Sequence, residues 1–352
     1  PYRIMRNADL PIDEDEAEDL LVEIQKQLKK RQWGEVIRLE VEDKTDSRLL
    51  GILKKEFDIK EEDIFYINGP LDLTMLMKVY GQDGFDQYKE PKYTPAVVPA
   101  FADTSKDIFQ VIREGDVFLH HPYMSFDPVV NFVRQAAKDP DVLAIKQTLY
   151  RVSGNSPIIA ALAQAAENGK QVSVLVELKA RFDEENNIGW SKLLEESGCH
   201  VMYGPQGLKV HSKLCLITRK VGDSVKYTVQ VGTGNYNEKT AGLYTDLCLM
   251  TSNNDIAQDA CEVFRTLSMG ELVESSKALM VAPHCLQNKV VELMDNEISI
   301  ARAGGEGYVA AKLNSLTDKV LMDKIIECSQ AGVKVELVIR GISCLVAGVE
   351  GV

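Results

Sequence analysis

The feature that most constrains this chain is an alternation of two hydrophobic patterns, which begins near residue 107. Short β-rich runs alternate with stretches of helical spacing. In chain order these are Val142–Leu149, a helix over 157–167, Val172–Leu178, a helix over 188–197 and His200–Tyr203. Strands separated by helices are typical of a mainly parallel sheet covered by helices. The sequence therefore predicts an α/β fold class for this region.

The alternating region also contains a weak internal repeat. In the first copy a strand around Lys146 is followed by a helix and by Asn168-Gly169. In the second copy a strand around Lys312 is followed by a helix and by Ala331-Gly332. The lysine and the glycine are 23 residues apart in one copy and 20 in the other, so the match needs a three-residue gap. The repeat predicts two similar halves, and the alternative is a chance match between two strand-helix-strand units.

The part of the chain before the alternation predicts a small α/β unit. Its expected elements are an amphipathic helix over 12–31, a strand at Val36–Val41, a helix near 46–56, a strand at Ile64–Ile67 and a helix from Leu71. Three prolines follow within a short stretch, at Pro91, Pro95 and Pro99. Such a stretch indicates the boundary that closes this unit.

Charge and composition exclude several classes of protein. A net charge of -13 argues against a nucleic-acid coat, so a phosphate substrate must meet a local basic pocket. No run of 18 apolar residues occurs, which predicts a soluble protein without a membrane-spanning helix. The seven cysteines include no C-x-x-C pair. This pattern favours reduced cytosolic thiols that serve as small hydrophobic side chains.

The most specific local pattern surrounds His211. Residues 207–219 alternate with period two, so His211, Lys213 and Cys215 are expected to share one face of a strand. A second β-rich run follows Gly222-Asp223, which predicts a hairpin centred near residue 222. An imidazole and an ammonium group would then point toward the same spot.

Reflection of His211 across the hairpin centre reaches residues 233 and 234, inside the loop Gly232-Thr-Gly-Asn-Tyr-Asn237. The glycines Gly232 and Gly234 let backbone N–H groups approach a phosphate closely. Asn235 adds an amide that can orient an imidazole or an oxyanion. Because a neutral imidazole can attack phosphorus directly, the pattern predicts phosphoryl transfer at His211 with Lys213 supplying positive charge.

Further cations follow strand-like runs. Arg151 and Arg181 come after two successive runs, and Arg340 comes after the corresponding run of the second copy. In sheets of this kind ligands lie beyond the carboxyl ends of the strands, where guanidinium groups suit a polyanion. The alternative for each arginine is a surface charge or an ion-pair partner.

Several other residues are expected to be structural. The acids of the range 183–185 are interpreted as partners for the arginines rather than as catalytic acids. Tyr244, judged from its surroundings alone, is expected in the core. The histidines with a structural or exposed interpretation are His120, His121, His200 and His284.

The H-x-K pattern of His211 and Lys213, followed by Gly232-Thr-Gly-Asn235, resembles the half-site of the phospholipase D superfamily. In that superfamily two half-sites form one active site, and a histidine becomes covalently phosphorylated. The superfamily also carries an aspartate five residues after the lysine, where this chain has Thr218. That difference weakens the interpretation as a phosphodiesterase.

Longer runs along essentially the whole chain resemble the polyphosphate kinases. These runs are Glu16–Leu21, His121–Phe126, Ala180–Glu185, Gly207–Lys213, Gly232–Ala241 and Leu243–Asp246. The resemblance implies reversible transfer of the ATP γ-phosphate to the end of inorganic polyphosphate through a phosphohistidine. It also implies a head domain over 1–98, a first phospholipase D-like catalytic domain with a mixed sheet over 99–275, and the incomplete start of a second over 276–352.

The resemblance assigns roles residue by residue. His211 matches the phosphorylated histidine, and Tyr244 and Arg340 match positions that contact ATP. Arg151 and Arg181 match positions associated with Mg²⁺. Because a guanidinium group has no lone pair for a cation, these two are expected to bind phosphate oxygens or water that the metal shares. The implied cofactor is Mg²⁺, and the implied ligands are ATP or ADP and polyphosphate.

The resemblance further implies a homo-oligomer in the cytoplasm, and it leaves peripheral association with a membrane open. Two alternatives remain: a phospholipase D-like phosphodiesterase, and a fragment that binds phosphate or nucleotide without turnover. The chain lacks an initiator methionine and the family's second catalytic histidine. We therefore expect an internal piece, inactive or impaired in isolation, that ends before the catalytic site is complete.

Overall fold

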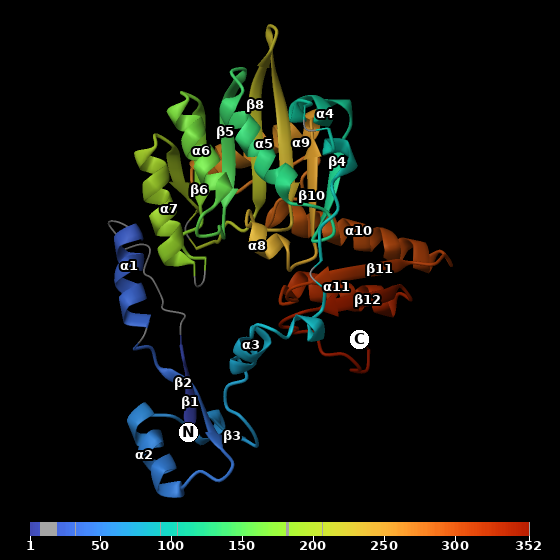
Figure 1. The fold of residues 1–352 in the computed structure, drawn as a ribbon. Coiled ribbons are helices and arrows are strands. Elements are labelled where there is room, and N and C mark those ends of the chain that lie inside the picture. The colour runs from blue at the N-terminus through green and yellow to red at the C-terminus, as the bar shows by residue number, and fades with distance from the viewer. Residues whose placement is uncertain are drawn as a thin grey trace. The chain divides into compact units, whose positions relative to one another are not determined.

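The computed structural model describes residues 1–7, 20–31, 33–91, 93–103, 105–180, 183–205 and 207–351. The chain forms two compact units, each described below by itself. The first comprises residues 1–225 and 230–250, and the second comprises residues 226–229 and 251–352. The mixture of helices and sheets confirms the predicted α/β class (Figure 1). The predicted domain boundaries at 98/99 and 275/276 stay predictions.

The chain begins with a three-stranded sheet. Its strands are β1 (Tyr2–Arg6), β2 (Val36–Glu42) and β3 (Ile64–Ile67), in the order β1-β2-β3. β2 pairs antiparallel with β1 and parallel with β3. Helix α2 (Ser47–Phe57) begins where the Asp46 carboxylate accepts the backbone N–H groups of Arg48 and Leu49. Leu39, Val41 and Leu50 are buried together and join the helix to the sheet. This is the small α/β unit that the sequence predicts.

Two helices of this region differ in extent from the prediction. Helix α1 (Leu20–Arg31) covers the second part of the expected helix over 12–31, and residues 12–19 lie outside the described residues. Helix α3 (Met75–Tyr80) begins four residues later than the expected start at Leu71. The Asp72 carboxylate accepts both the backbone N–H and the hydroxyl of Thr74, at 2.9 and 2.7 Å. This local turn competes with helix formation and delays the start.

The larger sheet of the chain has seven strands in the order β4-β10-β9-β8-β5-β6-β7. Their bounds are β4 (Val117–His121), β5 (Val142–Leu149), β6 (Gln171–Val176), β7 (His200–Tyr203), β8 (Lys213–Val221), β9 (Ser224–Gly232) and β10 (Asp246–Thr251). β5, β6 and β7 are parallel, whereas β8 is antiparallel to β5 and β10 is antiparallel to β4. The sheet is therefore mixed, as the resemblance implies. The three strands whose pattern predicts a mainly parallel sheet, β5, β6 and β7, are parallel, and the antiparallel pairs lie outside them.

The hairpin explains why the sheet is mixed. β8 and β9 are neighbours joined by the two-residue turn Gly222-Asp223, so their directions must be opposite. Gly222 has φ = +60°, the left-handed region that such a tight turn requires and that glycine adopts without strain. The predicted hairpin is thus confirmed, and its first strand, β8, adds an antiparallel pairing to the parallel strands because it pairs with β5.

A row of helices packs against this sheet (Figure 1). Their bounds are α4 (Ile108–Glu114), α5 (Asp127–Lys138), α6 (Pro157–Glu167) and α7 (Glu184–Glu196), and a short helix α8 (Glu238–Ala241) follows β9. α6 has the bounds that the sequence predicts, because Ser156 caps its first turn and Pro157 occupies its first position. α7 begins at Glu184 rather than 188, since two acids in its first turn suit the helix dipole.

The second unit holds helices α9 (Asn254–Ser268), α10 (His284–Arg302) and α11 (Lys319–Gln330) with the parallel strands β11 (Tyr308–Leu313) and β12 (Lys334–Ile339). Met294, Ile298 and Cys328 are buried in its core. The units β5-α6-β6 and β11-α11-β12 are both parallel strand-helix-strand motifs. In each, a glycine with φ of +80° or +87° follows the helix. The predicted pair of similar units is therefore present in the fold.

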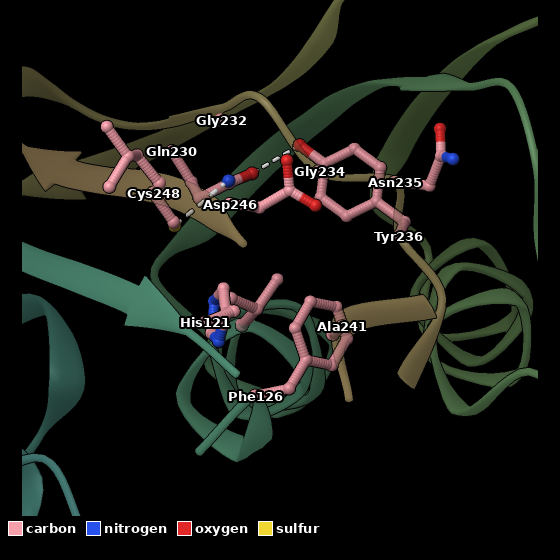
Figure 2. Close-up of a pocket in the computed structure, with 12 residues that line it drawn as sticks. His121, Phe126, Gln230, Gly232, Gly234, Asn235, Tyr236, Ala241, Asp246 and Cys248 are labelled. Atoms are coloured by element: carbon pink, nitrogen blue, oxygen red, sulfur yellow. Dashed lines mark hydrogen bonds between the residues drawn. The ribbon is translucent and has the colours of Figure 1, made fainter. Parts of the chain in front are cut away.

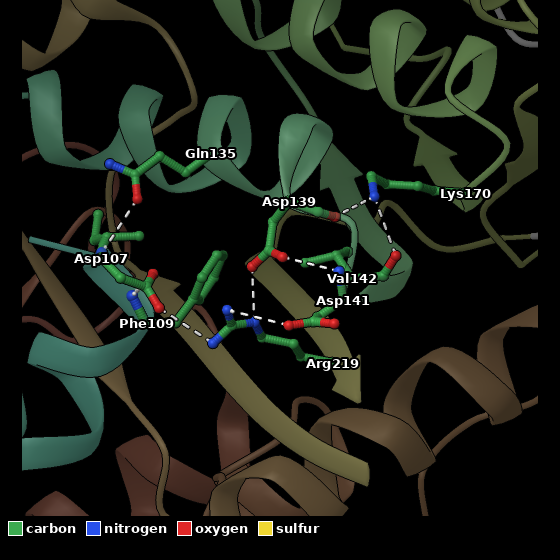
Figure 3. A network of polar contacts seen from close by, with 9 residues as sticks. Asp107, Phe109, Gln135, Asp139, Asp141, Val142, Lys170 and Arg219 are labelled. Carbon is green, nitrogen blue, oxygen red and sulfur yellow. Dashed lines mark hydrogen bonds and ion pairs between the residues drawn. The ribbon is translucent and has the colours of Figure 1, made fainter. Parts of the chain in front are cut away.

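One partly buried cation connects three segments of the first unit (Figure 3). Arg219, near the end of β8, lies 2.7 Å from the Asp139 carboxylate, 3.1 Å from that of Asp107 and 3.8 Å from that of Asp141. Its guanidinium carbon lies 5.4 Å from the centroid of the Phe109 ring. The side chain is only 16% exposed, so little solvent screens these pairs. The network fixes the start of α4 and the turn before β5 against β8.

We expect Arg219→Met to lower the free energy of unfolding by about 3 kcal/mol, because three carboxylates would lose their shared cation in a partly buried site. Thermal unfolding should then shift downward by roughly 5 °C or more. The matched control is Arg265→Met, whose pair with Glu262 is largely exposed. The control should move the midpoint by about 1 °C at most. Equal shifts in the two variants would contradict the structural role of the Arg219 network.

Candidate functional site

The site begins where the pairing of β5 with β8 ends. The paired residues run from Val142 with Arg219 to Gln147 with Cys215. One residue further along β5, the Thr148 side chain replaces the backbone as the hydrogen-bond partner of the neighbouring segment. Its Oγ1 accepts the Leu214 N–H at 3.0 Å and donates to the Ser212 carbonyl at 2.8 Å. A side chain thus satisfies backbone groups that the ladder no longer pairs.

This change moves His211 off the strand. β8 begins at Lys213, and His211 lies two residues before it in an exposed segment. The expectation that His211, Lys213 and Cys215 share one strand face is therefore wrong for the histidine. The physical reason is the Thr148 hydroxyl, which ends the regular pairing and turns the chain at Ser212. Lys213 and Cys215 do lie in the strand, and both are buried.

His211 and Lys213 nevertheless meet, and an aromatic ring joins them. The His211 ring packs edge-on against Tyr150, with 4.4 Å between ring centroids and 78° between planes. The Lys213 ammonium lies 5.0 Å from the centroid of the same Tyr150 ring. Its Nζ also donates a hydrogen bond to the His211 carbonyl. The structure therefore brings imidazole and ammonium together, as the sequence predicts, by contacts that the sequence does not reveal.

Lys213 is an unusual lysine because it is only 4% exposed. Burial lowers its pKa to about 8, the nearby Arg151 lowers it too, and the Asp246 carboxylate opposes the shift. Lysine is rarely buried without a purpose, since desolvation of an ammonium group is costly. The side chain is thus a cation that titrates close to neutral pH.

His211 is poised as a neutral base. Desolvation of the part of the ring that packs against its neighbours lowers its pKa to about 4, and the positive charges of Lys213 and Arg151 contribute in the same direction. The residue still has an exposed surface from which a ligand can approach. At neutral pH the imidazole therefore keeps a free lone pair while cations surround it.

Arg151 is the second cation of this cluster. Its guanidinium carbon lies 5.5 Å from the Tyr150 ring centroid, and its Nε lies 2.8 Å from the Asp183 carboxylate. This pair confirms that Asp183 is a partner of an arginine. Arg181, the other arginine predicted at these strand ends, lies outside the described residues.

The glycine-rich loop after β9 packs on the first residue of β10, which is Asp246. The Thr233 hydroxyl donates to the Asp246 carboxylate at 2.8 Å and accepts the Leu247 N–H at 3.0 Å. A Cβ atom on Gly234 would lie 2.7 Å from the same carboxylate. Only glycine fits at this position, because any side chain would displace Asp246. Since Asp246 also acts on the charge of Lys213, the loop and the cation are electrostatically linked.

A small cavity lies between this loop and β4 (Figure 2). Asn235 and Asp246 line it together with His121, Gly232 and Gln230. Its volume of about 10 Å³ is close to the minimum for one water molecule. The structure thus places Asn235, Gly232 and Gly234 at this cavity. Their predicted contacts with a phosphate or with the His211 ring stay predictions.

His121 is one wall of that cavity and is buried, which agrees with its structural interpretation. Its backbone pairs with Asp246 across β4 and β10, and its Nδ1–H donates to the Met124 carbonyl at 3.0 Å. Burial lowers the pKa of His121, so the ring is neutral at pH 7. Across the cavity, Gln230 donates to the Cys248 thiol at 3.2 Å and accepts from the Tyr236 hydroxyl.

The remaining predicted ligands lie at the surface. Tyr244 is 50% exposed, so the expectation from pattern alone that it lies in the core is wrong. It lies in the short segment between α8 and β10. Arg340 belongs to the second unit, where its Nε donates to the Asn314 side chain at 2.9 Å. Their contacts with nucleotide stay predictions.

Sequence reasoning did not single out four residues of the site. Tyr150 and Thr148 precede Arg151, and their position at the end of an apolar run is the only signal they give. Asp246 closes the run 243–246 and could be found only through its pairing with β4. Glu177 directly follows β6, and its only signal is that it is a charged residue inside the apolar run Val172–Leu178.

We expect the His211 pKa, measured by proton or carbon NMR titration of the five histidines, to be about 4. Lys213→Met should raise that pKa, since loss of a neighbouring positive charge favours the protonated ring. It should not restore the ordinary value near 6.5, because desolvation persists. Lys209→Met, an exposed lysine of the same segment, should leave it unchanged. A wild-type value near 6.5 would contradict the described site.

Family models for polyphosphate kinases match three parts of the chain. The middle-domain model matches residues 1–79, the C-terminal domain 1 model matches residues 107–272, and the C-terminal domain 2 model matches residues 279–352. Polyphosphate kinases from Staphylococcus epidermidis and Bacillus anthracis are 49% and 51% identical to it over all of its length. These matches cover 48% and 50% of the two relatives.

A solved structure agrees with these matches. The crystal structure of polyphosphate kinase from Porphyromonas gingivalis is similar over 99% of this chain and 50% of that one, with a TM-score of 0.80 and 31% identity. The chain therefore spans about half the length of the relatives it matches. Since three models of one family, sequence matches over the whole of this chain and a solved structure agree, the chain belongs to the polyphosphate kinase family.

Proposed function

We propose that the protein carrying this sequence transfers the γ-phosphoryl group of ATP reversibly to the end of inorganic polyphosphate, with His211 as the phosphorylated intermediate. The observation that carries the proposal is a neutral imidazole next to two cations. Family membership supports the substrates, because the matched relatives are named polyphosphate kinases. The site contributes the nucleophile and its electrostatic surroundings.

The proposed reaction has two steps. In the first, the lone pair of a His211 ring nitrogen forms a bond to the γ-phosphorus while the bond to the oxygen of the leaving ADP breaks. In the second, a terminal oxygen of polyphosphate attacks the same phosphorus, and the bond to nitrogen breaks. Lys213 and Arg151 lie near enough to act on the charge of the His211 ring, and they would stabilise negative charge on the transferred group. No proton needs to leave the ring before attack, since its pKa is about 4.

The other predicted residues complete the proposal. Arg181 would add positive charge beside Arg151, and Asn235 with the N–H groups near Gly232 and Gly234 would contact phosphate oxygens. Tyr244 and Arg340 would contact the nucleotide. Self-association, a cytoplasmic location and contact with a membrane surface also stay predictions. No helix within the described ranges is both long and apolar enough to cross a membrane.

Mg²⁺ belongs to this proposal as a companion of the phosphates. The described part of the chain contains no cluster of three or more His, Cys, Asp or Glu side chains that could hold a metal ion by itself. Arg151 offers no lone pair to a cation, and its Nε faces the Asp183 carboxylate. The residues therefore do not fit a metal held by the protein alone, and Mg²⁺ would be held chiefly by phosphate oxygens and water.

We expect γ-labelled ATP to leave an acid-labile, alkali-stable label on the protein, and we expect His211→Ala to abolish that label. The reason is that His211 alone combines a depressed pKa with two neighbouring cations. The control is His200→Ala, an exposed histidine at the start of β7, which should retain the full label. Retention of the label in His211→Ala would overturn the assignment.

The pH dependence of labelling should follow Lys213. Its pKa of about 8 means that the charge is present below pH 8 and is lost as pH rises through that value, so the labelling rate should fall above about pH 8. Asp246→Asn removes the charge that raises the Lys213 pKa. The fall of the labelling rate at high pH, the alkaline limb of the pH profile, should therefore move to lower pH. Asp223→Asn, in the hairpin turn, should leave the limb in place. An alkaline limb that Asp246→Asn does not move would contradict this electrostatic account.

A phospholipase D-like phosphodiesterase is the competing function, and Thr218 disfavours it. The structure places Thr218 in β8, paired with Ala144 of β5, so it is part of the sheet. Hydrolysis of a phosphodiester without ATP would favour this alternative. If the chain binds nucleotide or polyphosphate but accepts no label, it is a binding fragment without turnover.

A further inference from the structure

A buried carboxylate holds the backbone immediately before His211. Glu177 lies at the carboxyl end of β6 and is 2% exposed. Its Oε2 accepts the Val210 N–H at 2.7 Å, and its Oε1 accepts the Lys179 N–H at 2.8 Å. One side chain thus connects the end of a parallel strand with the residue that precedes the proposed nucleophile.

Further contacts fix the segment that leads to His211. The Lys179 ammonium donates to the Leu208 carbonyl at 3.4 Å. A Cβ atom on Gly204 would lie only 2.8 Å from the Val210 side chain, so the chain passes close to itself there. Val210 is itself buried. The backbone before His211 is therefore held by a buried charge and by close packing.

A second buried polar residue extends this arrangement to Tyr150. Asn187, 1% exposed in α7, donates to the Glu177 carbonyl at 2.8 Å and to the Tyr150 carbonyl at 2.7 Å. Tyr150 is the residue whose ring packs edge-on against His211. Glu177 and Asn187, here called the polar clamp, thus reach both the backbone before His211 and the residue that supports its ring.

We propose that Glu177 is a positioning residue for His211, and that Asn187 assists it by holding Tyr150 and β6 in place. The proposal rests on the proposed function of His211 as the nucleophile. In-line attack on phosphorus tolerates little misplacement, because a shift of about 1 Å can cost two orders of magnitude in rate. The Glu177 carboxylate binds the backbone N–H groups of Val210 and Lys179, so it acts on His211 through the backbone of Val210.

The carboxylate is needed because it offers two acceptor oxygens to two separate N–H donors. Glutamine at this position has one acceptor oxygen and one NH₂ group, and the NH₂ group would face a backbone N–H. The Glu177→Gln side chain can therefore accept a hydrogen bond from the Val210 N–H or from the Lys179 N–H, but not from both. The volume of the side chain is nearly unchanged, so the variant tests the bonds rather than the packing.

The test compares Glu177→Gln with Asp259→Asn in the protein that carries this sequence. Asp259 is a matched control, because its buried carboxylate accepts the backbone N–H groups of Lys277, Ala278 and Leu279 and has no bond to the His211 segment. Three quantities are measured in each variant: the rate of His211 labelling from ATP, the affinity for ATP, and the rate at which diethyl pyrocarbonate modifies His211. Thermal unfolding reports the stability of each variant.

We expect Glu177→Gln to slow His211 labelling by roughly ten-fold or more, with the affinity for ATP within about two-fold of wild type. The rate of His211 modification should change as well. Asp259→Asn should lower stability without changing either rate at His211. A Glu177→Gln variant that labels and reacts at wild-type rates would overturn the positioning role, as would an equal loss of labelling in both variants.

The modification rate separates this inference from the proposed function. If wild-type protein accepts no label, the proposed function fails, whatever the variants do. Suppose that Glu177→Gln then still alters the rate at which diethyl pyrocarbonate modifies His211, while Asp259→Asn does not. The polar clamp would then be shown to position His211 even though His211 is not phosphorylated. If neither variant alters that rate, the inference fails together with the proposed function.

Discussion

The geometry of the site depends on one hydroxyl group, that of Thr148. β5 and β8 pair as far as Gln147 and Cys215, and the Thr148 side chain then binds both Leu214 and Ser212. Each such bond contributes only about 1 kcal/mol net, yet a buried N–H left unpaired costs about 1–3 kcal/mol. The hydroxyl therefore lets the chain leave the sheet at Ser212 without that cost, and the released segment carries His211.

The electrostatics of the site follow from this exit. β8 begins at Lys213, and the ammonium group of this lysine is buried near the Tyr150 ring. The same ammonium group donates a hydrogen bond to the backbone carbonyl of His211. Burial lowers both pKa values, and Arg151 lowers them further. The result is a neutral imidazole beside a lysine that is still charged at pH 7. Asp246, held by the loop after β9, keeps that lysine from losing its charge.

Much of this could be predicted from sequence where a signal is local. β5 and α6 have the predicted bounds because their signals lie in neighbouring residues. β5 begins with an apolar run, and α6 begins with a Ser cap followed by Pro. The start of β8 could not be predicted, since the group that ends its pairing is Thr148, 66 residues away. The same holds for Glu177 and Asp246: their importance comes from partners that only the fold brings near. Arg151, by contrast, is identifiable by residue type and by its position after a strand, and Lys213 is identifiable by its place two residues after His211.

Backbone amide exchange across residues 210–214 tests most directly whether two buried side chains hold His211 outside the sheet. The structure predicts slow hydrogen–deuterium exchange at Val210 and Leu214, whose N–H groups are bound by Glu177 and Thr148. It predicts faster exchange at His211 and Ser212 between them. Uniformly slow exchange would mean that the strand continues through His211, and uniformly fast exchange would mean that neither side chain holds it. Either result would contradict this account.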